Sequence, residues 1–298
     1  MNILITGGKG QLANSIMDLF KRRECSLGKV DEIYFHGQIF CVDKHHLDIT
    51  SLEHVKSYFK KIKPGIVINT AAYTHVDDCE SNIDLAYKIN ALGPRNLSII
   101  CEEIQAKLIH ISTDYVFDGK SKIPYKEFDS PHPINIYGKS KYLGEEYVKQ
   151  FCSKYFILRT SWLYGHKGKN FVKTILKASK EKEVLRVVND QIGNPTYAED
   201  LAYHILKLGP TKEYGIYHCT GNDSCSWYEF AKAILQYTNS NCKIQPTSSS
   251  DYKSVATRPN YSTLDHMMLR CTIGDKMRHW KVALEDFINN YERNVPLS

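Results

Sequence analysis

An alternation of strand-like and helix-like segments over the first 160 residues constrains the fold more than any other feature of the chain. Apolar runs predict strands at residues 2–6, 39–43, 66–69, 108–112 and 155–160, and amphipathic stretches predict helices at 11–20, 51–61, 84–103 and 135–150. Strands and helices that alternate in this way form right-handed crossover units around a parallel sheet. We therefore expect an α/β fold, a Rossmann-type doubly wound parallel sheet.

The second half of the chain is less regular. Its pattern predicts helices at 170–180, 227–237 and 278–293, a strand at 214–220 that returns to the sheet, and a loop rich in Ser, Thr and Pro at 247–260. The 298 residues are enough for two coupled domains. We expect residues 1–160, with roughly 189–222, to form the Rossmann domain. Residues 161–188 and 223–298 would form a smaller C-terminal substrate-binding lobe.

Polar or small residues stand at the carboxyl ends of the expected strands. Because these ends meet at one edge of a parallel sheet, ligands bind there. The residues concerned are Thr6-Gly7, Asp43, Ala71-Ala72, Ser112-Thr113 and Thr160-Ser161. Their convergence from separate strands predicts one ligand site.

The composition is that of an ordinary globular protein, with 42% hydrophobic and 24% charged residues. The net charge of +6 is spread along the chain, which indicates a solvated surface with a mild attraction for anions, and no stripe or motif favours nucleic-acid binding. An anionic nucleotide substrate would benefit from the same sign. No apolar run approaches the roughly 18 residues of a membrane-spanning helix. Charged residues such as Asp18 and Arg22 make the first helix part of the fold, so we expect no signal peptide.

Cysteine and histidine patterns limit the location and the chemistry. The nine cysteines form no Cys-x-x-Cys pair, so a disulfide framework is not expected and a reducing cytoplasm fits best. The twelve histidines show no ligand spacing either. We therefore expect no metal site.

The first strand runs into the turn Gly7-x-x-Gly10-x-x-Ala13. Glycines there let the backbone approach a dinucleotide pyrophosphate at the N-terminus of the next helix. The pattern departs from the usual G-x-G-x-x-G fingerprint, and a tight strand-to-helix turn could use the same residues. Its position after the first strand favours a cofactor site.

Asp43 ends the second strand, 33 residues after Gly10. A carboxylate there can accept hydrogen bonds from an adenosine ribose, which favours NADH. The adjacent Lys44 could instead hold a 2′-phosphate, which favours NADPH. A solvated turn is the alternative, so the cofactor is expected to be NADPH or NADH.

Tyr137 and Lys141 lie four residues apart and would share one face of a helix. Thr113 ends the strand 24 residues upstream of Tyr137. In a nicotinamide enzyme, Thr113 would orient the reacting carbonyl, Tyr137 would act as general acid, and Lys141 would lower the pKa of the phenol and hold the nicotinamide ribose. Tyr228 and Lys232 have the same spacing but follow no such strand, so we expect Tyr228 to pack in the interior.

Three further residues are candidates for contacts with the substrate. Trp162 follows the strand at 155–160 and could stack on a sugar or serve as a core aromatic. Gln191 lies in a shaped loop at 190–196 and could meet a base or a diphosphate. Arg258 could clamp a phosphate or remain solvated.

The chain resembles the extended short-chain dehydrogenases and, within them, the dTDP-4-dehydrorhamnose reductase family. The segments that carry the resemblance run from residue 2 to residue 265 and so cover nearly the whole chain. They are residues 2–5 with Gly7, Gly10, Gln11 and Leu12, residues 47–49, 69–74, 76–77, 112–119, 137–141, 159–162 and 190–196, Arg258-Pro259 and Leu264-Asp265. The Ser-Thr-Asp-Tyr-Val-Phe and Arg-Thr-Ser-Trp runs are specific to these reductases.

The resemblance implies NADPH- or NADH-dependent reduction of a 4-keto-6-deoxy sugar on a nucleoside diphosphate. It implies that Thr113, Tyr137 and Lys141 are catalytic and that Thr113, Asp114 and Trp162 touch the sugar. The residues expected to line the cofactor are Gly7, Gly10, Gln11, Leu12, Asp43, Lys44, Asp48, Ile49, Ala71, Ala72, Tyr73, Thr74, Tyr137 and Lys141.

Alternatives remain within this resemblance. The substrate could be dTDP-4-dehydro-L-rhamnose or another nucleotide sugar, of talose or deoxyheptose type, and a regulatory binding protein of the same fold is a third reading. Some relatives dimerise through magnesium held by glutamates, but Ser15 stands at the matching position here. We expect a monomer or a homodimer, with no nucleic-acid or membrane partner.

Overall fold

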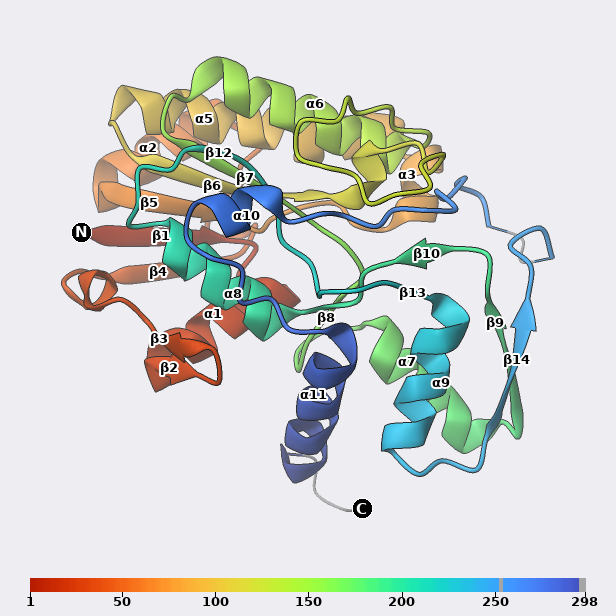
Figure 1. Ribbon diagram of the computed structural model, residues 1–298. Coiled ribbons are helices and arrows are strands. Elements are labelled where there is room, and N and C mark those ends of the chain that lie inside the picture. The colour runs from red at the N-terminus through yellow and green to blue at the C-terminus, as the bar shows by residue number, and fades with distance from the viewer. Residues whose placement is uncertain (252–253, 295–298) are drawn as a thin grey trace.

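The computed structural model describes residues 1–251 and 254–294, and its centre is a six-stranded parallel sheet (Figure 1). The strands lie in the order β12-β7-β6-β5-β1-β4. They are β1 (Asn2–Thr6), β4 (Ile39–Val42), β5 (Pro64–Asn69), β6 (Lys107–Thr113), β7 (Tyr155–Thr160) and β12 (Gly215–His218). The expected doubly wound α/β fold is confirmed, and the strand expected at 214–220 does return to the sheet, beside β7.

The strand order reverses at β1. This strand pairs with β4 on one side and with β5 on the other, so the chain first builds one edge of the sheet and then crosses back to build the rest. In open α/β sheets, ligands bind beyond the carboxyl ends of the strands at such a reversal. The end of β1 is therefore the natural position for a nucleotide.

Helices cover both faces of the sheet (Figure 1). On one face α2 (Leu52–Ile62), α5 (Gly93–Glu103) and α6 (Ile136–Phe151) bury side chains such as Phe59, Leu97 and Val148. On the other face α1 (Gln11–Arg22) packs beside α8 (Ala198–Leu208) over a second core. Strands buried on both sides are continuous apolar runs, which is why their positions could be predicted from the sequence.

A smaller group of helices lies beyond the carboxyl ends of the strands (Figure 1). These helices, α7 (Phe171–Glu181), α9 (Trp227–Tyr237) and α11 (Trp280–Asn294), enclose a separate core around Phe230. Three short strand pairs accompany them: β8 (Leu163–Tyr164) with β11 (Thr196–Tyr197), β10 (Ile192–Gly193) with β13 (Cys225–Ser226), and β9 (Val184–Val188) with β14 (Lys243–Thr247). Leu269 and Met277 lie in the part of the chain that was expected to form the smaller lobe, yet they pack in the core beneath the sheet. The expected division into domains stays a prediction.

The helix expected at 84–103 is present as a continuous helical stretch over residues 83–103, but its middle turn is π-helical. The structure has α3 (Val76–Ser81), α4 (Ile83–Tyr87), a π-helical turn at Lys88–Leu92 and then α5. Pro94 explains the interruption, because it has no N–H to donate to the carbonyl of Asn90 and its ring would clash with that carbonyl. The freed carbonyl points at α6, where a Cβ on Gly144 would lie 2.2 Å from it.

Segments without a sequence prediction form small closing elements. Residues 22–38 contain the hairpin of β2 (Glu24–Cys25) and β3 (Gly28–Lys29) and a 3₁₀ turn at Glu32–Phe35, from which Tyr34 is buried in the core under the sheet. The expected loop at 247–260 follows β14 and includes residues 252–253, which lie outside the described residues.

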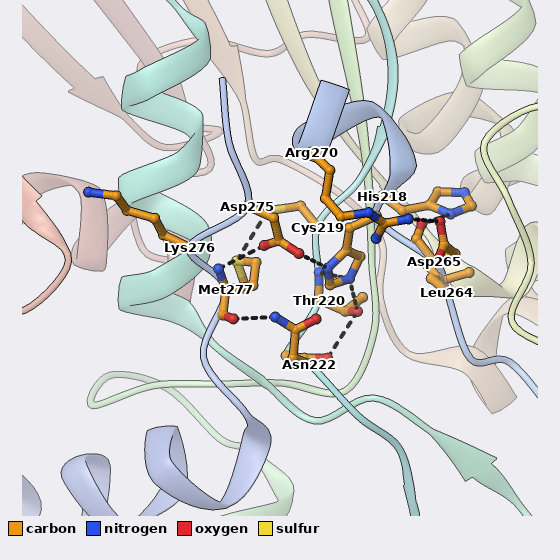
Figure 2. Close-up of polar contacts among 12 residues, drawn as sticks. His218, Cys219, Thr220, Asn222, Leu264, Asp265, Arg270, Asp275, Lys276 and Met277 are labelled. Carbon is orange, nitrogen blue, oxygen red and sulfur yellow. Dashed lines mark hydrogen bonds and ion pairs between the residues drawn. The ribbon is translucent and has the colours of Figure 1, made fainter. Parts of the chain in front are cut away.

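A polar cluster fastens the chain after residue 263 to the end of β12 (Figure 2). His266 Nε2 lies 2.7 Å from Thr220 Oγ1, and His266 Nδ1 lies 3.1 Å from Asp275 Oδ2. Asn222 donates to the carbonyl of Met277. Burial opposes the ionisation of Asp275, but the hydrogen bond and charge of His266 outweigh it, so the pKa of this carboxyl is lowered.

Candidate active site

The three expected catalytic residues come from two neighbouring elements. Thr113 is the last residue of β6 and caps a 3₁₀ turn at Asp114–Val116, while Tyr137 and Lys141 lie in the first two turns of α6. Asn135 begins α6 by accepting a hydrogen bond from the Gly138 amide at 2.8 Å. A Cβ on Gly138 would lie 2.1 Å from the carbonyl of Tyr115, so this glycine lets α6 approach the end of β6.

Thr113 is the centre of a buried hydrogen-bond group. Its hydroxyl interacts with the phenol of Tyr137, donates to Asp114 Oδ1 at 3.0 Å, and accepts from the amide of Tyr115. Burial raises the pKa of Asp114 to about 7, against the hydrogen bonds of Ser262 and Thr113. The other oxygen of Asp114, Oδ2, has no hydrogen-bond partner among the described residues and is available to a ligand.

Tyr137 is protonated in this environment. Burial raises the pKa of its phenol above the usual value, and the hydrogen bond with Thr113 only partly opposes the shift. The expected lowering of the phenol pKa depends on the charge of Lys141 together with that of the oxidised cofactor, so it stays a prediction for the enzyme with its cofactor bound. A fully protonated phenol still suits a group that must donate a proton.

Lys141 is buried beneath the same site. Its Nζ donates to the carbonyl of Ile111 at 2.5 Å and lies 3.5 Å from His110 Nε2. Burial lowers the pKa of Lys141 to about 8, although the charge of Glu145 opposes the shift. Glu145 itself is held by Arg159 and Ser112 in a buried network.

The turn after β1 fits a dinucleotide backbone. Gly7 has a φ of +71°, and a Cβ there would lie 2.8 Å from the Ala71 amide. Gly10 begins α1, and among the described residues no side chain caps that helix. Because the first amides of a helix point outward unpaired, this end of α1 can receive a phosphate.

Gln11 and Leu12 follow this turn, and their side chains contact different parts of the protein. Gln11 Oε1 accepts a hydrogen bond from Asn170, the residue that caps α7, so Gln11 connects the turn to the smaller group of helices. The side chain of Leu12 is buried in the core under the sheet. Any contact of Leu12 with a cofactor would come from its backbone.

Asp43 lies at the end of β4 beside the glycine turn. Its carboxylate pairs with Lys9 at 2.7 Å and with His46 at 2.8 Å, and these contacts hold its pKa well below the usual value. Lys44 is exposed. Lys9 was missed by the sequence reasoning, although it stands inside the glycine turn, and it places a second cation beside the expected ribose position.

Asp48 and Ile49, both expected to line the cofactor, differ in what they can offer it. Asp48 accepts hydrogen bonds from the amide and hydroxyl of Thr50, while the side chain of Ile49 lies in the core against Gly93. Ile49 can therefore offer only backbone groups, and its carbonyl already accepts from Asn96.

The segment Ala71–Thr74 is connected to the catalytic helix through Asn90. Tyr73 donates its amide to Asn90 Oδ1 at 2.8 Å and accepts from Asn90 Nδ2 at 3.0 Å, and the same Nδ2 lies 3.1 Å from Ser140 Oγ. Ala72 is partly exposed and Thr74 is exposed. Asn90 was missed because it lies inside an expected helix; the adjacent Gly93-Pro94 pair was the available signal for an irregular turn.

Trp162 is held in an unusual backbone conformation at the end of β7. Its φ is +45°, a region that bulky residues rarely adopt. One face of its indole stacks on Trp227, and a Cβ on Gly193 would lie 2.8 Å from the ring. The same Cβ would lie 3.0 Å from Ser262 Oγ, so the indole is a near neighbour of the Asp114 group.

Arg258 and Gln191 approach from the C-terminal part of the chain. Arg258 pairs with Asp77 in the first turn of α3 at 2.8 Å, and the carbonyl of the preceding Thr257 accepts from Asn135 at 2.8 Å. The Arg258 loop is thus fastened to the start of the catalytic helix. Gln191 is buried just before β10, and its part in a site stays a prediction.

The described part of the chain has neither a metal-binding cluster nor a membrane-spanning helix. Residues 1–251 and 254–294 contain no group of three or more His, Cys, Asp or Glu side chains that could hold a metal ion. Within the same ranges no helix has the length and apolar character needed to cross a bilayer. Whether catalysis needs a metal stays a prediction.

The chain is similar to known proteins over almost its whole length. The family model described as RmlD substrate binding domain matches residues 1–293. The spore coat polysaccharide biosynthesis protein SpsK of Bacillus subtilis (strain 168) is 40% identical over 286 residues, 96% of each chain. A dTDP-4-dehydrorhamnose reductase of Aggregatibacter actinomycetemcomitans is 38% identical over 296 residues, 95% of this chain and 97% of the relative. The crystal structure of a dTDP-4-dehydrorhamnose reductase from Bacillus anthracis str. Ames in complex with NADP has a TM-score of 0.90 and 45% identity, covering 97% of this chain and 99% of that one.

Proposed function

Because the chain belongs to the dTDP-4-dehydrorhamnose reductase family of extended short-chain dehydrogenases, we propose that it reduces the 4-keto group of a nucleoside-diphosphate 6-deoxy sugar with NADPH or NADH. The specific reaction is dTDP-4-dehydro-L-rhamnose to dTDP-L-rhamnose, for cell-surface polysaccharide synthesis. The observation that carries this proposal is the contact of the buried Thr113 with the partly buried Tyr137, with the buried Lys141 one helical turn behind.

The residues have distinct roles in this reaction. When the substrate binds, the Thr113 hydroxyl would turn its single hydrogen from Asp114 to the sugar C4 carbonyl oxygen and align that oxygen with the Tyr137 phenol. Tyr137 is protonated at neutral pH because burial raises its pKa, and it gives its proton to that oxygen as negative charge develops there. Reduced nicotinamide, when bound, supplies the hydride.

Lys141 stabilises the phenolate that forms after proton transfer. The carbonyl of Ile111 orients its Nζ, and the low water content around it strengthens the attraction between ammonium and phenolate. Asp114, with one free oxygen, accepts or donates a hydrogen bond to a sugar hydroxyl, since its pKa of about 7 lets both forms exist. Trp162 covers the sugar ring, and Arg258 binds the diphosphate.

The cofactor is held by the glycine turn and by the end of β4. The amides of α1 face the pyrophosphate, and Ala71 to Thr74 line the nicotinamide half. Asp43 receives a ribose diol, whereas Lys9 and Lys44 favour a 2′-phosphate, so both cofactors are accepted with modest discrimination. The unpaired cysteines, nine among the described residues, fit a cytoplasmic reaction, and the assembly is a monomer or a homodimer.

The test is turnover with purified nucleotide sugars. We expect oxidation of NADPH with dTDP-4-dehydro-L-rhamnose, and a product whose C4 configuration, read by NMR, is that of rhamnose. A product of talose configuration, or a preference for a deoxyheptose substrate, would move the chain to the related reductases. Binding of the nucleotide sugar without any cofactor oxidation would instead indicate a regulatory binding protein, against which the complete Thr113, Tyr137 and Lys141 set argues.

A further inference from the structure

A buried chain of hydrogen bonds runs from β1 to the catalytic helix. Thr6 Oγ1 donates to Asn69 Oδ1 at 2.7 Å, Asn69 Nδ2 lies 3.0 Å from His110 Nδ1, and His110 Nε2 lies 3.5 Å from Lys141 Nζ. These residues come from β1, β5, β6 and α6, and each is at most 2% exposed. The direction of every bond in this chain therefore matters, since a buried donor or acceptor that faces the wrong partner is costly.

The orientation of the Asn69 amide follows from its other partners. Its Oδ1 accepts from Thr6 and also from the Ala71 amide at 3.3 Å, and a backbone N–H can only donate. Asn69 must then present its NH₂ group to His110. Because Nδ1 of His110 accepts that hydrogen bond, the single proton of the imidazole is on Nε2. Burial and the charge of Lys141 lower the pKa of His110, which keeps the ring neutral.

This tautomer has a consequence for Lys141. The Nε2–H bond faces Nζ, and an ammonium ion has no lone pair to accept it, so the two donors repel each other. A neutral amine accepts the same bond. The carbonyl of Ile111 accepts from Nζ in either state, and as an acceptor it favours the ammonium.

Other charged and titratable groups around Lys141 act in the opposite direction or are already paired. Glu145, one turn further along α6, favours the ammonium form. Its carboxylate is shared with Arg159 from β7 and Ser112 from β6. Tyr137 precedes Lys141 on the same helix and is a neutral phenol before catalysis. His110 is thus the group facing Nζ that favours the neutral amine.

We propose that His110 is a positioning residue that, with Asn69 fixing its tautomer, holds Lys141 ready to lose its proton at working pH. The inference rests on the proposed function, because it assigns a role within that catalytic set. The neutral amine that remains when Lys141 passes a proton toward the Tyr137 phenolate accepts the bond from His110. A structural role alone would require only that His110 accept from Asn69.

The first test reads the tautomer without any reaction. In protein labelled with ¹⁵N-histidine and free of cofactor, we expect His110 to show a protonated Nε2 and an unprotonated Nδ1 at neutral pH. The His110→Phe variant identifies the signal by its loss. Protonation on Nδ1, or on both nitrogens, overturns the proposal whatever the enzyme's substrate is.

The second test reads the pH dependence of kcat for reduction. His110→Phe removes the N–H that opposes the ammonium, so the alkaline limb should move to higher pH by about one unit, which is a tenfold rate difference at a pH on that limb. Asn69→Asp should move it in the same direction, because a carboxylate accepts from Nδ1–H and leaves a lone pair on Nε2. An unmoved limb in either folded variant contradicts the proposal.

His204→Phe is the matched control. His204 is also buried and also has a partner at each ring nitrogen, here the carbonyl of Asp200 and the amide of Lys276, but it lies on α8 away from Lys141. The His204→Phe variant should lose thermal stability, while the alkaline limb of its kcat–pH profile should stay at the wild-type position. Wild-type protein that reduces no nucleotide sugar would refute the proposed function, while the tautomer measurement would still decide the role of His110.

Discussion

The indoles of Trp162 and Trp227 lie face to face, with ring centroids 3.4 Å apart and planes inclined by 8°. Trp227 begins α9, and its other neighbours include Phe171 on α7. The stack holds Trp162 in its left-handed backbone conformation, which costs roughly 1–2 kcal/mol for a residue with a side chain. Such a position is maintained only where the surroundings enforce it.

Loss of this stack should weaken substrate binding. Trp227→Ala removes the support of Trp162, so we expect KM for the nucleotide sugar to rise about tenfold, or about 1.4 kcal/mol, with little change in the Kd of NADPH. Steady-state kinetics and a fluorescence titration give the two values. Trp280→Phe, in the same core next to Phe230, is the control that should leave KM unchanged. An unchanged KM in Trp227→Ala would mean that Trp162 does not touch the sugar.

Removal of the Tyr137 hydroxyl should abolish most of the activity. Tyr137→Phe keeps the ring but cannot donate a proton, and loss of general acid catalysis reduces kcat by about 10²–10⁴. NADPH affinity should change little. Tyr228→Phe repeats the change in the second Tyr-x-x-x-Lys segment, where Tyr228 packs against the core of the smaller helices, and should be nearly silent. Near-normal turnover of Tyr137→Phe would refute the assignment of the proton donor.

The carboxylate of Asp43 should limit the preference for NADPH. Asp43→Asn removes a negative charge next to Lys9 and Lys44, so the ratio of kcat/KM for NADPH to that for NADH should rise about tenfold. In the wild type we expect this ratio to stay within about a thousandfold of unity, roughly 4 kcal/mol. A ratio that Asp43→Asn leaves unchanged would show that Asp43 does not face the ribose.

The His266–Asp275 contact makes stability depend on acid pH. Since the pKa of Asp275 is lowered on folding, its contribution is complete above the unfolded pKa of about 3.9 and is lost as the pH falls through the lower folded value. Asp275→Asn should therefore cost about 1–3 kcal/mol at pH 7. Urea unfolding should show this difference shrinking below about pH 4. A difference that stays constant down to acid unfolding would count against the ion pair.

Catalysis should not require a metal ion. In the proposed mechanism the proton comes from Tyr137 and the hydride from the cofactor, and Ser15 stands at the position where the family resemblance suggested a metal-binding glutamate. A hydroxyl is a poor substitute for a carboxylate around magnesium. Activity should survive exhaustive treatment with EDTA. Activity that disappears and then returns with magnesium would contradict this expectation and would point to a metal-dependent assembly.

Local patterns predicted much of the fold. The strands of the sheet are apolar runs because both of their faces are covered, and α1 and α2 carry their apolar residues at helical spacing. The helix expected at 84–103 is present, but its π-helical turn at Lys88–Leu92 was missed, because the pattern registers apolar spacing and not the hydrogen bond lost at Pro94. The pairing of β9 with β14 was missed because its partners lie far apart in the chain.

The residues of the candidate site also separate into those that could be predicted from the sequence and those that could not. Tyr137 and Lys141 could be selected because four residues make one helical turn and because Thr113 ends a strand. His110, Asn90 and Trp227 could not be selected, since each matters through a partner from another element. Leu12 and Ile49 matched a family pattern, yet their side chains lie in the core.

The sequence by itself determined the order of strands and helices, the glycine turn and the residues that carry acid chemistry, because these depend on neighbours within a few positions. Only the tertiary structure decided that Asn69 and His110, 41 residues apart, meet on adjacent strands and direct a hydrogen bond toward Lys141. Hydrogen-bond direction and burial depend on which segments pack together in space. No spacing along the chain records them.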